Sequence, residues 1–352
     1  MRENCAEWML GYLALAGCGF VVVPVDPHLK AGEASHILTD SESSLVWADD
    51  ALAAVLDEAS TSTRIILASE FDRLLESLRD ADLAAAAKFW EAHVPEAGDL
   101  ASIVYTSGTT GLPKGAMLSH GNFTSNVDQT FSRVMFYETD HFLLVLPLFH
   151  AFSFTANFVV PLWCGCSMVF VQSLRTVGQD IHDTKPTVLC AVPLLAEKLH
   201  EKIEDGLRKS KFAQFLMKVG LRGPVMHMVK LKLGGKLRFI ITGGAPCPRH
   251  VMESFNRIHV RFLEGYGLTE CSPVVSVCPP EVKEIGTIGL PIKGIEVRLA
   301  DQNEQGVGEL QVKGPIVMQG YFHNPDASAE AFEDDGKGGL WLRTGDLASM
   351  DA

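Results

Sequence analysis

The sequence predicts an α/β protein with parallel sheets packed between helices, followed by a smaller antiparallel unit. Continuous apolar runs of strand length recur up to about residue 284, as in "PTVLCAVP" and "KLRFIITGG", and helical patterns lie between them. Strands that helices cover on both faces carry such runs. From about residue 285 glycines become frequent and the strands alternate, as in "IEVRLAD" and "GELQVKG". This alternation is typical of antiparallel strands, so we divide the chain into residues 1–284 and 285–352.

The elements of the first unit follow from these runs in order. An uncharged helical stretch ends near Gly17, and the β-branched run "FVVVPV" at residues 20–25 predicts a strand. Further strands are predicted at residues 43–49, 63–69, 100–107, 141–149, 167–172, 186–193 and 236–244, and helices at residues 51–58, 194–204 and 249–257.

Composition and charge limit the class of protein. A chain of 352 residues is long enough for a large core. The net charge of -13 argues against a nucleic-acid-binding protein, which would show a basic face. The eight cysteines are scattered, with one C-x-C and no C-x-x-C pair. They indicate reduced, mostly buried thiols in a cytosolic protein rather than a metal site.

Two uncharged runs have the length of a membrane span, but neither has the pattern of a single helix. Residues 8–25 contain Gly17 and Gly19 before the β-branched run, and residues 142–171 are interrupted by Pro147 and Pro161. The N-terminal "MREN" lacks the basic start of a signal peptide. We therefore expect a cytoplasmic enzyme.

The stretch "YTSGTTGLPKG", residues 105–115, follows a predicted strand and gathers four hydroxyls, three glycines and one lysine. It is not a Walker loop, because Lys114 stands between Pro113 and Gly115. The glycines nevertheless let backbone N–H groups approach an anion, the hydroxyls donate hydrogen bonds and the lysine supplies charge. The stretch therefore predicts a polyphosphate site, and the alternative is a solvated Ser/Gly-rich hairpin.

Five strings occur in order along the chain, namely "YTSGTTGLPKG", "PLFHAF", "ITGGAP", "GYGLTE" and "RTGDL". Together they resemble the adenylate-forming (AMP-binding) superfamily, and the chain is similar to the large N-terminal domain of a long-chain fatty acyl-CoA synthetase. The resemblance implies two parallel-rich sheets layered with helices, plus a smaller, distorted antiparallel β-barrel in residues 285–352. It also implies ATP-dependent activation of a fatty acid to acyl-AMP and pyrophosphate, with Mg²⁺ as metal and CoA as acyl acceptor.

The same strings assign site residues by resemblance. Tyr266 stacks on adenine, Thr269 meets the phosphates, and Glu270 holds Mg²⁺, for which a carboxylate is a suitable hard ligand. Asp346 accepts hydrogen bonds from the ribose hydroxyls. The alternatives are a surface carboxylate for Glu270 and an Asx-turn residue for Asp346. The catalytic set is Lys114, His150, Thr269 and Glu270. The other nucleotide-binding residues are Thr106, Ser107, Gly108, Thr109, Thr110, Gly111, Gly243, Gly244, Ala245, Pro246, Gly265 and Gly267.

The residues after "PLFH" bear on the acid that is activated. Amino-acid-activating relatives usually place an aspartate after the motif phenylalanine, because a buried ammonium without a partner is costly. Here His150 and Ala151 follow Phe149, and the flanking "FSFTANFVVPLW" is apolar. This favours a hydrocarbon chain, although a buried strand and helix would look the same. By resemblance the acyl site comprises Phe149, His150, Phe154, Gly267 and Gly289, with Phe154 where some members carry a gating tryptophan. The alternative for His150 is a core histidine.

A basic stretch runs from Lys198 to Arg238. It contains eleven Lys or Arg and three Asp or Glu, interleaved with Phe212, Phe215 and Leu216 as in an amphipathic surface helix. Such a face fits peripheral contact with an anionic membrane or with CoA phosphates, and the alternative is a solvated basic helix. Long-chain synthetases carry a helical insertion at this place, so the resemblance favours a long-chain fatty acid as substrate. A homodimer is a further expectation.

The chain departs from the family pattern at both ends. It opens on a segment that normally lies inside the large domain, and it stops soon after "RTGDL", without the usual hinge and C-terminal lid domain. We expect a fragment that binds ATP but turns over weakly. Two alternatives remain, a fatty acyl-AMP ligase that donates to a carrier protein and a non-catalytic nucleotide- or acyl-binding module.

Overall fold

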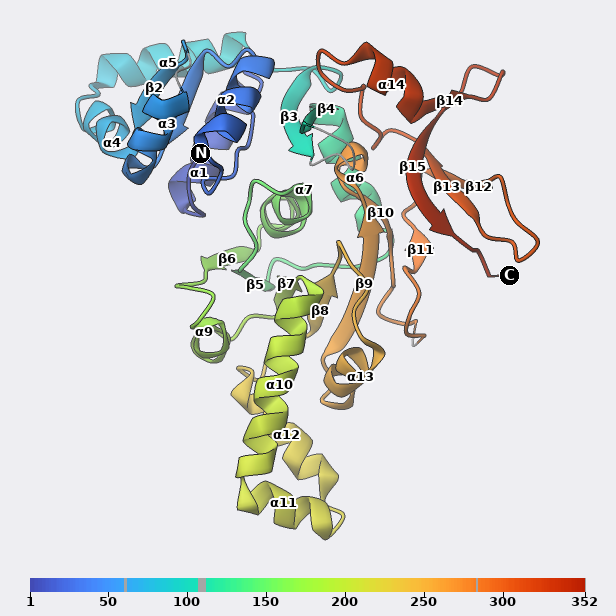
Figure 1. Ribbon diagram of the computed structural model, residues 1–352. Coiled ribbons are helices and arrows are strands. Elements are labelled where there is room, and N and C mark those ends of the chain that lie inside the picture. Colours follow the sequence, from blue (N-terminus) through green and yellow to red (C-terminus); the bar gives the residue numbers. More distant parts are fainter. Residues whose placement is uncertain (60–61, 107–111, 283, 352) are drawn as a thin grey trace.

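A seven-stranded sheet forms the centre of the molecule (Figure 1). The computed structural model describes residues 1–59, 62–106, 112–282 and 284–351. The strand order is β11-β10-β9-β8-β7-β5-β6. The strands β5 to β9 are parallel, and β10 and β11 add to one edge in the antiparallel sense. Their bounds are His141–Leu144 (β5), Ser167–Phe170 (β6), Val188–Ala191 (β7), Phe239–Thr242 (β8), Arg261–Gly267 (β9), Val274–Val277 (β10) and Leu290–Pro291 (β11).

Both faces of the parallel strands are buried, as their unbroken apolar runs predict. Side chains alternate between the two faces along a strand. Val188 and Cys190 belong to one hydrophobic core, and Leu189 and Ala191 to a second core. The helices α1, α6 and α7 contribute to the first core, and α9, α10 and α13 to the second. Their bounds are Ala6–Gly17 (α1), His120–Thr130 (α6), Ala151–Ser153 (α7), Val177–Thr184 (α9), Pro193–Lys209 (α10) and Arg249–Arg257 (α13).

The N-terminal layer contains a two-stranded parallel sheet and its helices. Strands β1 (Leu45–Ala48) and β2 (Arg64–Leu67) pair in register. The helices of this layer are α2 (Ala31–Asp40), η1 (Asp50–Leu52), α3 (Ala53–Ala59), α4 (Ala68–Glu76) and α5 (Asp80–Ala92). The prediction of a strand at residues 20–25 was wrong. Only Val22 forms a bridge there, to Ser102, and Pro24 has no N–H with which to extend the ladder.

A hairpin precedes the central sheet. Strands β3 (Leu100–Thr106) and β4 (Lys114–Ser119) pair in the antiparallel sense, with Thr106 opposite Lys114. The segment 318–322, which we call the strap, lies along the other side of β4. The backbone N–H of Met117 donates to the carbonyl of Gly320 (2.9 Å), and the N–H of Phe322 donates to the carbonyl of Gly115 (2.8 Å).

The C-terminal strands form a separate antiparallel sheet in the order β12-β13-β15-β14. This agrees with the alternation that the sequence shows after residue 285. The bounds are Glu296–Ala300 (β12), Gly308–Lys313 (β13), Phe332–Asp334 (β14) and Leu340–Ala348 (β15), and α14 (Pro325–Ala331) precedes β14.

Three helices project away from the sheets at the bottom of Figure 1. They are α10, α11 (Lys211–Lys218) and α12 (Arg222–Lys232). Short helical segments η2 (Phe154–Val159), α8 (Val160–Trp163) and η3 (Thr269–Cys271) complete the fold. Within the ranges described above, no helix combines the length and the apolar character needed to cross a bilayer. The eight cysteines are free thiols and five are buried, which confirms the prediction of mostly buried thiols.

Candidate active site

A cavity of about 970 Å³ opens at the carboxyl ends of the five parallel strands. The segment that follows each strand forms part of the cavity wall. Open α/β sheets usually bind ligands at these carboxyl ends. The lining residues at these ends are Val145, Leu146, Pro147, Val171, Gln172, Ser173, Leu174, Val192, Ile241, Gly243, Gly244, Gly265, Tyr266, Gly267, Leu268 and Thr269. The cavity therefore brings together residues of three predicted strings, "PLFHAF", "ITGGAP" and "GYGLTE".

Glycines let the backbone form one wall of this cavity. Gly244 has φ +83°, a conformation that side chains disfavour, and a Cβ on Gly243 would lie 3.4 Å from the carbonyl oxygen of Gly265. A Cβ on Gly267 would lie 1.9 Å from the carbonyl oxygen of Pro273, so a side chain is excluded there. A flat ring can therefore approach the backbone at this wall. Ala245 and Pro246 follow on the exposed side and are not among the lining residues.

Tyr266 on β9 and Asp346 on β15 meet although they belong to different sheets. The hydroxyl of Tyr266 donates a hydrogen bond of 2.6 Å to Oδ2 of Asp346. Burial raises the pKa of the Tyr266 phenol, and the bond to Asp346 raises it further. The turn before Asp346 is fixed by Glu309, whose Oε1 accepts from the N–H of Gly345 (3.1 Å). The structure thus places the predicted adenine-stacking and ribose-binding side chains next to each other.

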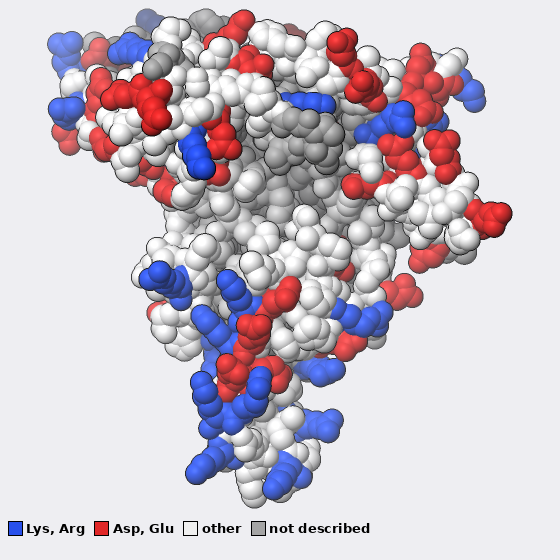
Figure 2. Space-filling model, viewed as in Figure 1, with Lys and Arg blue, Asp and Glu red and all other residues white. Residues whose placement is uncertain are grey.

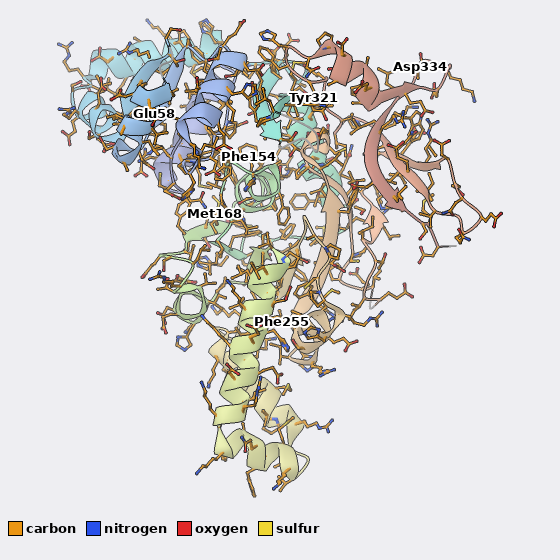
Figure 3. All side chains as sticks on the ribbon, in the orientation of Figure 1. Glu58, Phe154, Met168, Phe255, Tyr321 and Asp334 are labelled. Carbon is orange, nitrogen blue, oxygen red and sulfur yellow. The ribbon has the colours of Figure 1, made fainter. Side chains whose placement is uncertain are left out.

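A second group of polar side chains lies where the phosphates were predicted. Glu270 on η3 accepts a hydrogen bond of 2.7 Å at Oε1 from the hydroxyl of Tyr321. The Nζ of Lys114 lies 5.3 Å from the centre of the Tyr321 ring. Burial raises the pKa of Tyr321, and the nearby Glu270 adds to that rise. Tyr321 is labelled close to β3 and β4 in Figure 3.

The hairpin of β3 and β4 contains the two flanks of the predicted phosphate loop that the structure describes. Thr106 and Lys114 are partners across β3 and β4, and Nε2 of His36 lies 3.2 Å from the carbonyl oxygen of Pro113. Thr269 lines the cavity next to Glu270. The predicted phosphate ligands Ser107, Gly108, Thr109, Thr110 and Gly111 lie outside the described residues.

The chemistry of the Glu270 group fits Mg²⁺. Its Oε1 is held by Tyr321, and Oε2 accepts from no donor in the described part of the chain. That part also holds no cluster of three or more His, Cys, Asp or Glu side chains that could form a complete metal cage. Mg²⁺ commonly takes one or two protein carboxylates together with water and substrate phosphates. One oriented carboxylate beside a phosphate site matches that mode.

The predicted acyl-binding residues divide into two groups. His150 lines the cavity and Gly267 forms part of its wall. Partial burial lowers the pKa of His150, and Asp26 partly opposes that effect, so the environment favours the neutral imidazole. Phe149, Phe154 and Gly289 are not among the lining residues.

Phe154 occupies the aromatic core instead of the cavity, near α7 in the middle of the molecule (Figure 3). It is 5% exposed, and its ring centre lies 4.6 Å from that of Tyr12 and 5.0 Å from that of Phe123. Its neighbours Thr155 and Ala156 line the cavity. Phe154 therefore points to the opposite side of this helical segment, which makes it a core residue rather than a gate. Gly289, with φ +80°, packs against the backbone of Val277 and Cys278.

The motifs do not predict Tyr321, because it stands outside the five strings. The sequence marks Tyr321 only weakly, as an aromatic residue that follows Gly320 in the run "MQGYF". The strap places it beside Lys114 and Glu270, which are 156 positions apart along the chain and become neighbours only in the fold. The apolar stretch at residues 152–163 contributes Phe152, Ala156 and Val160 to the cavity wall. Other apolar lining residues, among them Val134, Phe136, Val274 and Val277, lie outside that stretch and were not predicted.

Comparison with known families agrees with this geometry. The family model described as "AMP-binding enzyme" matches residues 1–322. The chain belongs to the AMP-binding enzyme family. The resemblance carried by the five strings is thereby confirmed.

Long-chain acyl-CoA ligases are among the relatives of this AMP-binding chain. Long-chain-fatty-acid-CoA ligase 1 of Cavia porcellus is 30% identical over 392 residues, covering 98% of this chain. This chain spans 55% of the length of that ligase.

Solved structures agree on the fold. The N-terminal domain of FACL13 from Mycobacterium tuberculosis has a TM-score of 0.79 at 24% identity, covering 99% of this chain and 82% of that chain. ATP-bound MatB from Rhodopseudomonas palustris has a TM-score of 0.76 at 26% identity, covering 99% of this chain and 65% of that chain. The predicted fold class, that of an acyl-CoA synthetase N-terminal domain, is confirmed.

Proposed function

We propose that this AMP-binding chain carries the site in which ATP activates a long-chain fatty acid to an acyl adenylate. The observation that carries the proposal is the arrangement of two polar pairs near one cavity. Tyr266 and Asp346 are suited to a nucleoside, and Glu270 with Lys114 is suited to its phosphates. Apolar side chains, among them Val134, Phe136 and Val274, form much of the rest of the cavity wall, and such a surface favours a hydrocarbon chain.

Each pair has a distinct role in the proposed reaction. Adenine lies between the Gly243–Gly244 backbone and the Tyr266 ring, while the Asp346 carboxylate accepts from the ribose hydroxyls. The ammonium of Lys114 attracts the β- and γ-phosphates, and Thr269 donates a hydrogen bond to the phosphate chain. Mg²⁺, when bound through Glu270, neutralises phosphate charge.

The chemical step is a displacement at phosphorus. A carboxylate oxygen of the fatty acid attacks the α-phosphorus, and the bond between that phosphorus and the pyrophosphate oxygen breaks. Both reactants are anionic, so the reaction needs fixed positive charge and hydrogen-bond donors around the phosphates. Lys114 supplies such charge. The neutral imidazole of His150 at the cavity is suited to orient the carboxylate without pairing it as an ion.

The acceptor in the second step is proposed to be CoA, since the relative from Cavia porcellus is named a CoA ligase. The thiolate of CoA attacks the acyl carbon, and AMP leaves. A fatty acid of long chain partitions into bilayers, so peripheral contact with a membrane belongs to the same proposal.

The experiment is ATP–pyrophosphate exchange with saturated fatty acids of increasing length, read together with binding of a fluorescent ATP analogue. We expect saturable nucleotide binding that needs Mg²⁺, and exchange that rises with chain length. Trapping of the adenylate as a hydroxamate reports its formation, and a parallel reaction with CoA or an acyl-carrier protein in place of hydroxylamine identifies the acceptor. Nucleotide binding without exchange would support a binding module, and absence of both would contradict the proposal.

A further inference from the structure

Two asparagines on α6 bond to the segments that carry the proposed metal and phosphate groups. Asn122 and Asn126 are four positions apart, so they lie on the same face of the helix. Asn122 is 7% exposed and Asn126 is fully buried. Burying an amide is costly unless its donors and its acceptor are bonded. The partners of these two amides therefore indicate what the side chains do.

Asn126 binds the segment that follows Glu270. Its Nδ2 donates to the carbonyl oxygens of Cys271 (3.0 Å) and Val274 (2.8 Å), and its Oδ1 accepts from the N–H of Val274 (3.3 Å). These residues join η3 to β10. The amide of Asn126 therefore fixes the backbone directly after the carboxylate of Glu270.

Asn122 binds the segment that leads into the strap. Its Nδ2 donates to the carbonyl oxygens of Pro315 (2.7 Å) and Val317 (3.0 Å). Its Oδ1 accepts from the N–H of Ser119 (2.8 Å), which caps the first turn of α6. The strap follows Val317 directly and carries Tyr321, so Asn122 fixes the backbone where the strap begins.

The two segments that the asparagines bind also bond to each other. The hydroxyl of Ser272 donates to the carbonyl oxygen of Ile316 (2.9 Å), and both residues are fully buried. The N–H of Met318 donates to the carbonyl oxygen of Glu270 (2.8 Å). The backbone of Glu270 is therefore held from α6 and from the strap at the same time.

Helix α6 also connects this arrangement to Lys114. It begins directly after β4, and Lys114 is the first residue of β4. On the face that Figure 2 shows, Lys and Arg side chains gather over the lower projection, away from β3 and β4 at the top. That basic surface lies apart from the proposed phosphate site, whose charge then depends on the placement of Lys114 and Glu270.

We infer that Asn122 and Asn126 are positioning residues, which hold the Glu270 carboxylate in place beside Lys114 for the binding of Mg²⁺ and phosphate. The inference rests on the proposed function, because it takes Glu270 as the metal ligand. Neither asparagine is among the lining residues of the cavity, so both act through the backbone that they bind. An amide nitrogen carries two hydrogens and can bond two carbonyls at once, whereas an aspartate would place an oxygen against them.

The first test is amide hydrogen exchange in the metal-free chain, measured residue by residue by NMR. In Asn126→Ala and in Asn122→Ala, the N–H of Met318 should exchange about tenfold faster than in the parent, because its acceptor on Glu270 is no longer held. The milder Ser272→Ala keeps both asparagines and should give a smaller increase. Unchanged exchange at Met318 in all three variants would overturn the inference.

The second test measures the Mg²⁺ concentration needed for half-maximal binding of a fluorescent ATP analogue. Asn126→Ala and Asn126→Asp should raise it by roughly tenfold, while the affinity for adenosine, which lacks phosphates, stays within about twofold of the parent. In a Glu270→Gln background, Asn126→Ala should cause no further rise, since the carboxylate that it positions is gone. A further rise there would contradict the inference. If Glu270→Gln itself left the Mg²⁺ requirement unchanged, the metal role in the proposed function would fail, and the exchange at Met318 would still decide the positioning.

Two controls separate positioning from a general loss of stability. Asp128→Ala changes an exposed side chain of α6 and should leave both measurements unchanged. Arg238→Met breaks the ion pair with the buried Asp140 (2.6 Å), outside the cavity lining. It should lower the midpoint of thermal unfolding, as the asparagine variants do, and keep the Mg²⁺ requirement of the parent. An equal rise in the Mg²⁺ requirement of Arg238→Met and Asn126→Ala would show that lost stability alone explains the effect.

Discussion

The hydroxyl of Tyr321 donates a hydrogen bond of 2.7 Å to Glu270, while its ring faces the ammonium of Lys114 at 5.3 Å. A single side chain thus contacts both charged groups proposed to handle the phosphates. The hydrogen bond fixes one carboxylate oxygen of Glu270 and leaves the other for a metal ion. Groups that orient a ligand in this way commonly change metal affinity by about 10- to 100-fold when removed.

Tyr321→Phe should therefore raise the Mg²⁺ concentration needed for half-maximal binding of an ATP analogue, by roughly tenfold. The ring stays in place, so its contact with Lys114 is kept. Tyr321→Leu removes both contacts and should have the larger effect. Fluorescence titration with Mg²⁺ at fixed nucleotide measures this. Tyr137→Phe, at a residue 52% exposed and away from the cavity wall, is the control. An unchanged Mg²⁺ requirement in Tyr321→Phe would show that the bond does not orient Glu270.

Asp346→Ala should weaken ATP binding by about tenfold or more, because hydrogen bonds to a charged group contribute about 1.5–3 kcal/mol. The loss should be much smaller for 2′-deoxy- and 3′-deoxy-ATP, which lack one of the proposed donors. Tyr266→Phe keeps the aromatic face and should give an intermediate loss. Competition against a fluorescent analogue provides the affinities. If Asp346→Ala weakened all three nucleotides equally, the carboxylate would not contact the ribose.

Lys114→Ala should reduce ATP affinity by about tenfold or more while fatty-acid binding stays within about twofold of the parent, since the ammonium addresses only the phosphates. Lys88→Ala, at an exposed position on α5, is the matched control. Calorimetric titration with ATP and with a fatty acid separates the two ligands. Equal loss of both would point to a folding defect and not to a phosphate contact.

Arg238→Met should lower the free energy of unfolding by about 3 kcal/mol. Asp140 is 1% exposed, and both of its oxygens accept from Nη1 of Arg238 at 2.6 Å. Thr187 also donates to Oδ1 at 2.6 Å, so part of the carboxylate's bonding survives. Urea unfolding measures the loss. Combining Arg238→Met with Asp140→Asn should recover part of it, because the buried charge is then removed. An additive loss would mean that the two residues act separately.

The sequence predicted the elements whose cause is local. Continuous apolar runs identified the parallel strands β5 to β8, because a strand buried on both faces carries few polar side chains. The run at residues 100–107 also forms a strand, but it belongs to an antiparallel hairpin. The helix at residues 249–257 was predicted with its exact bounds, which match α13. The glycine-lined wall proposed for adenine could also be predicted from the sequence, since paired glycines after a strand indicate close approach of a ligand.

Other features depend on contacts that no local pattern records. The run at residues 20–25 is apolar and β-branched, yet it finds only a single bridge to Ser102. The apolar stretch around Phe154 fitted either a pocket or a core, and only the direction of the side chain decides between them. Tyr321 joins the site through the strap along β4, a pairing of segments far apart in sequence.

The bond between Tyr266 and Asp346 has a mechanical consequence. Tyr266 belongs to the seven-stranded sheet and Asp346 to the four-stranded one, so a nucleotide held by both would act as a removable cross-link between the sheets. Binding at 100 times the dissociation constant stabilises a folded protein by about 2.7 kcal/mol. Here that stabilisation would oppose separation of the two sheets. Amide hydrogen exchange along β15 would therefore slow when ATP is bound.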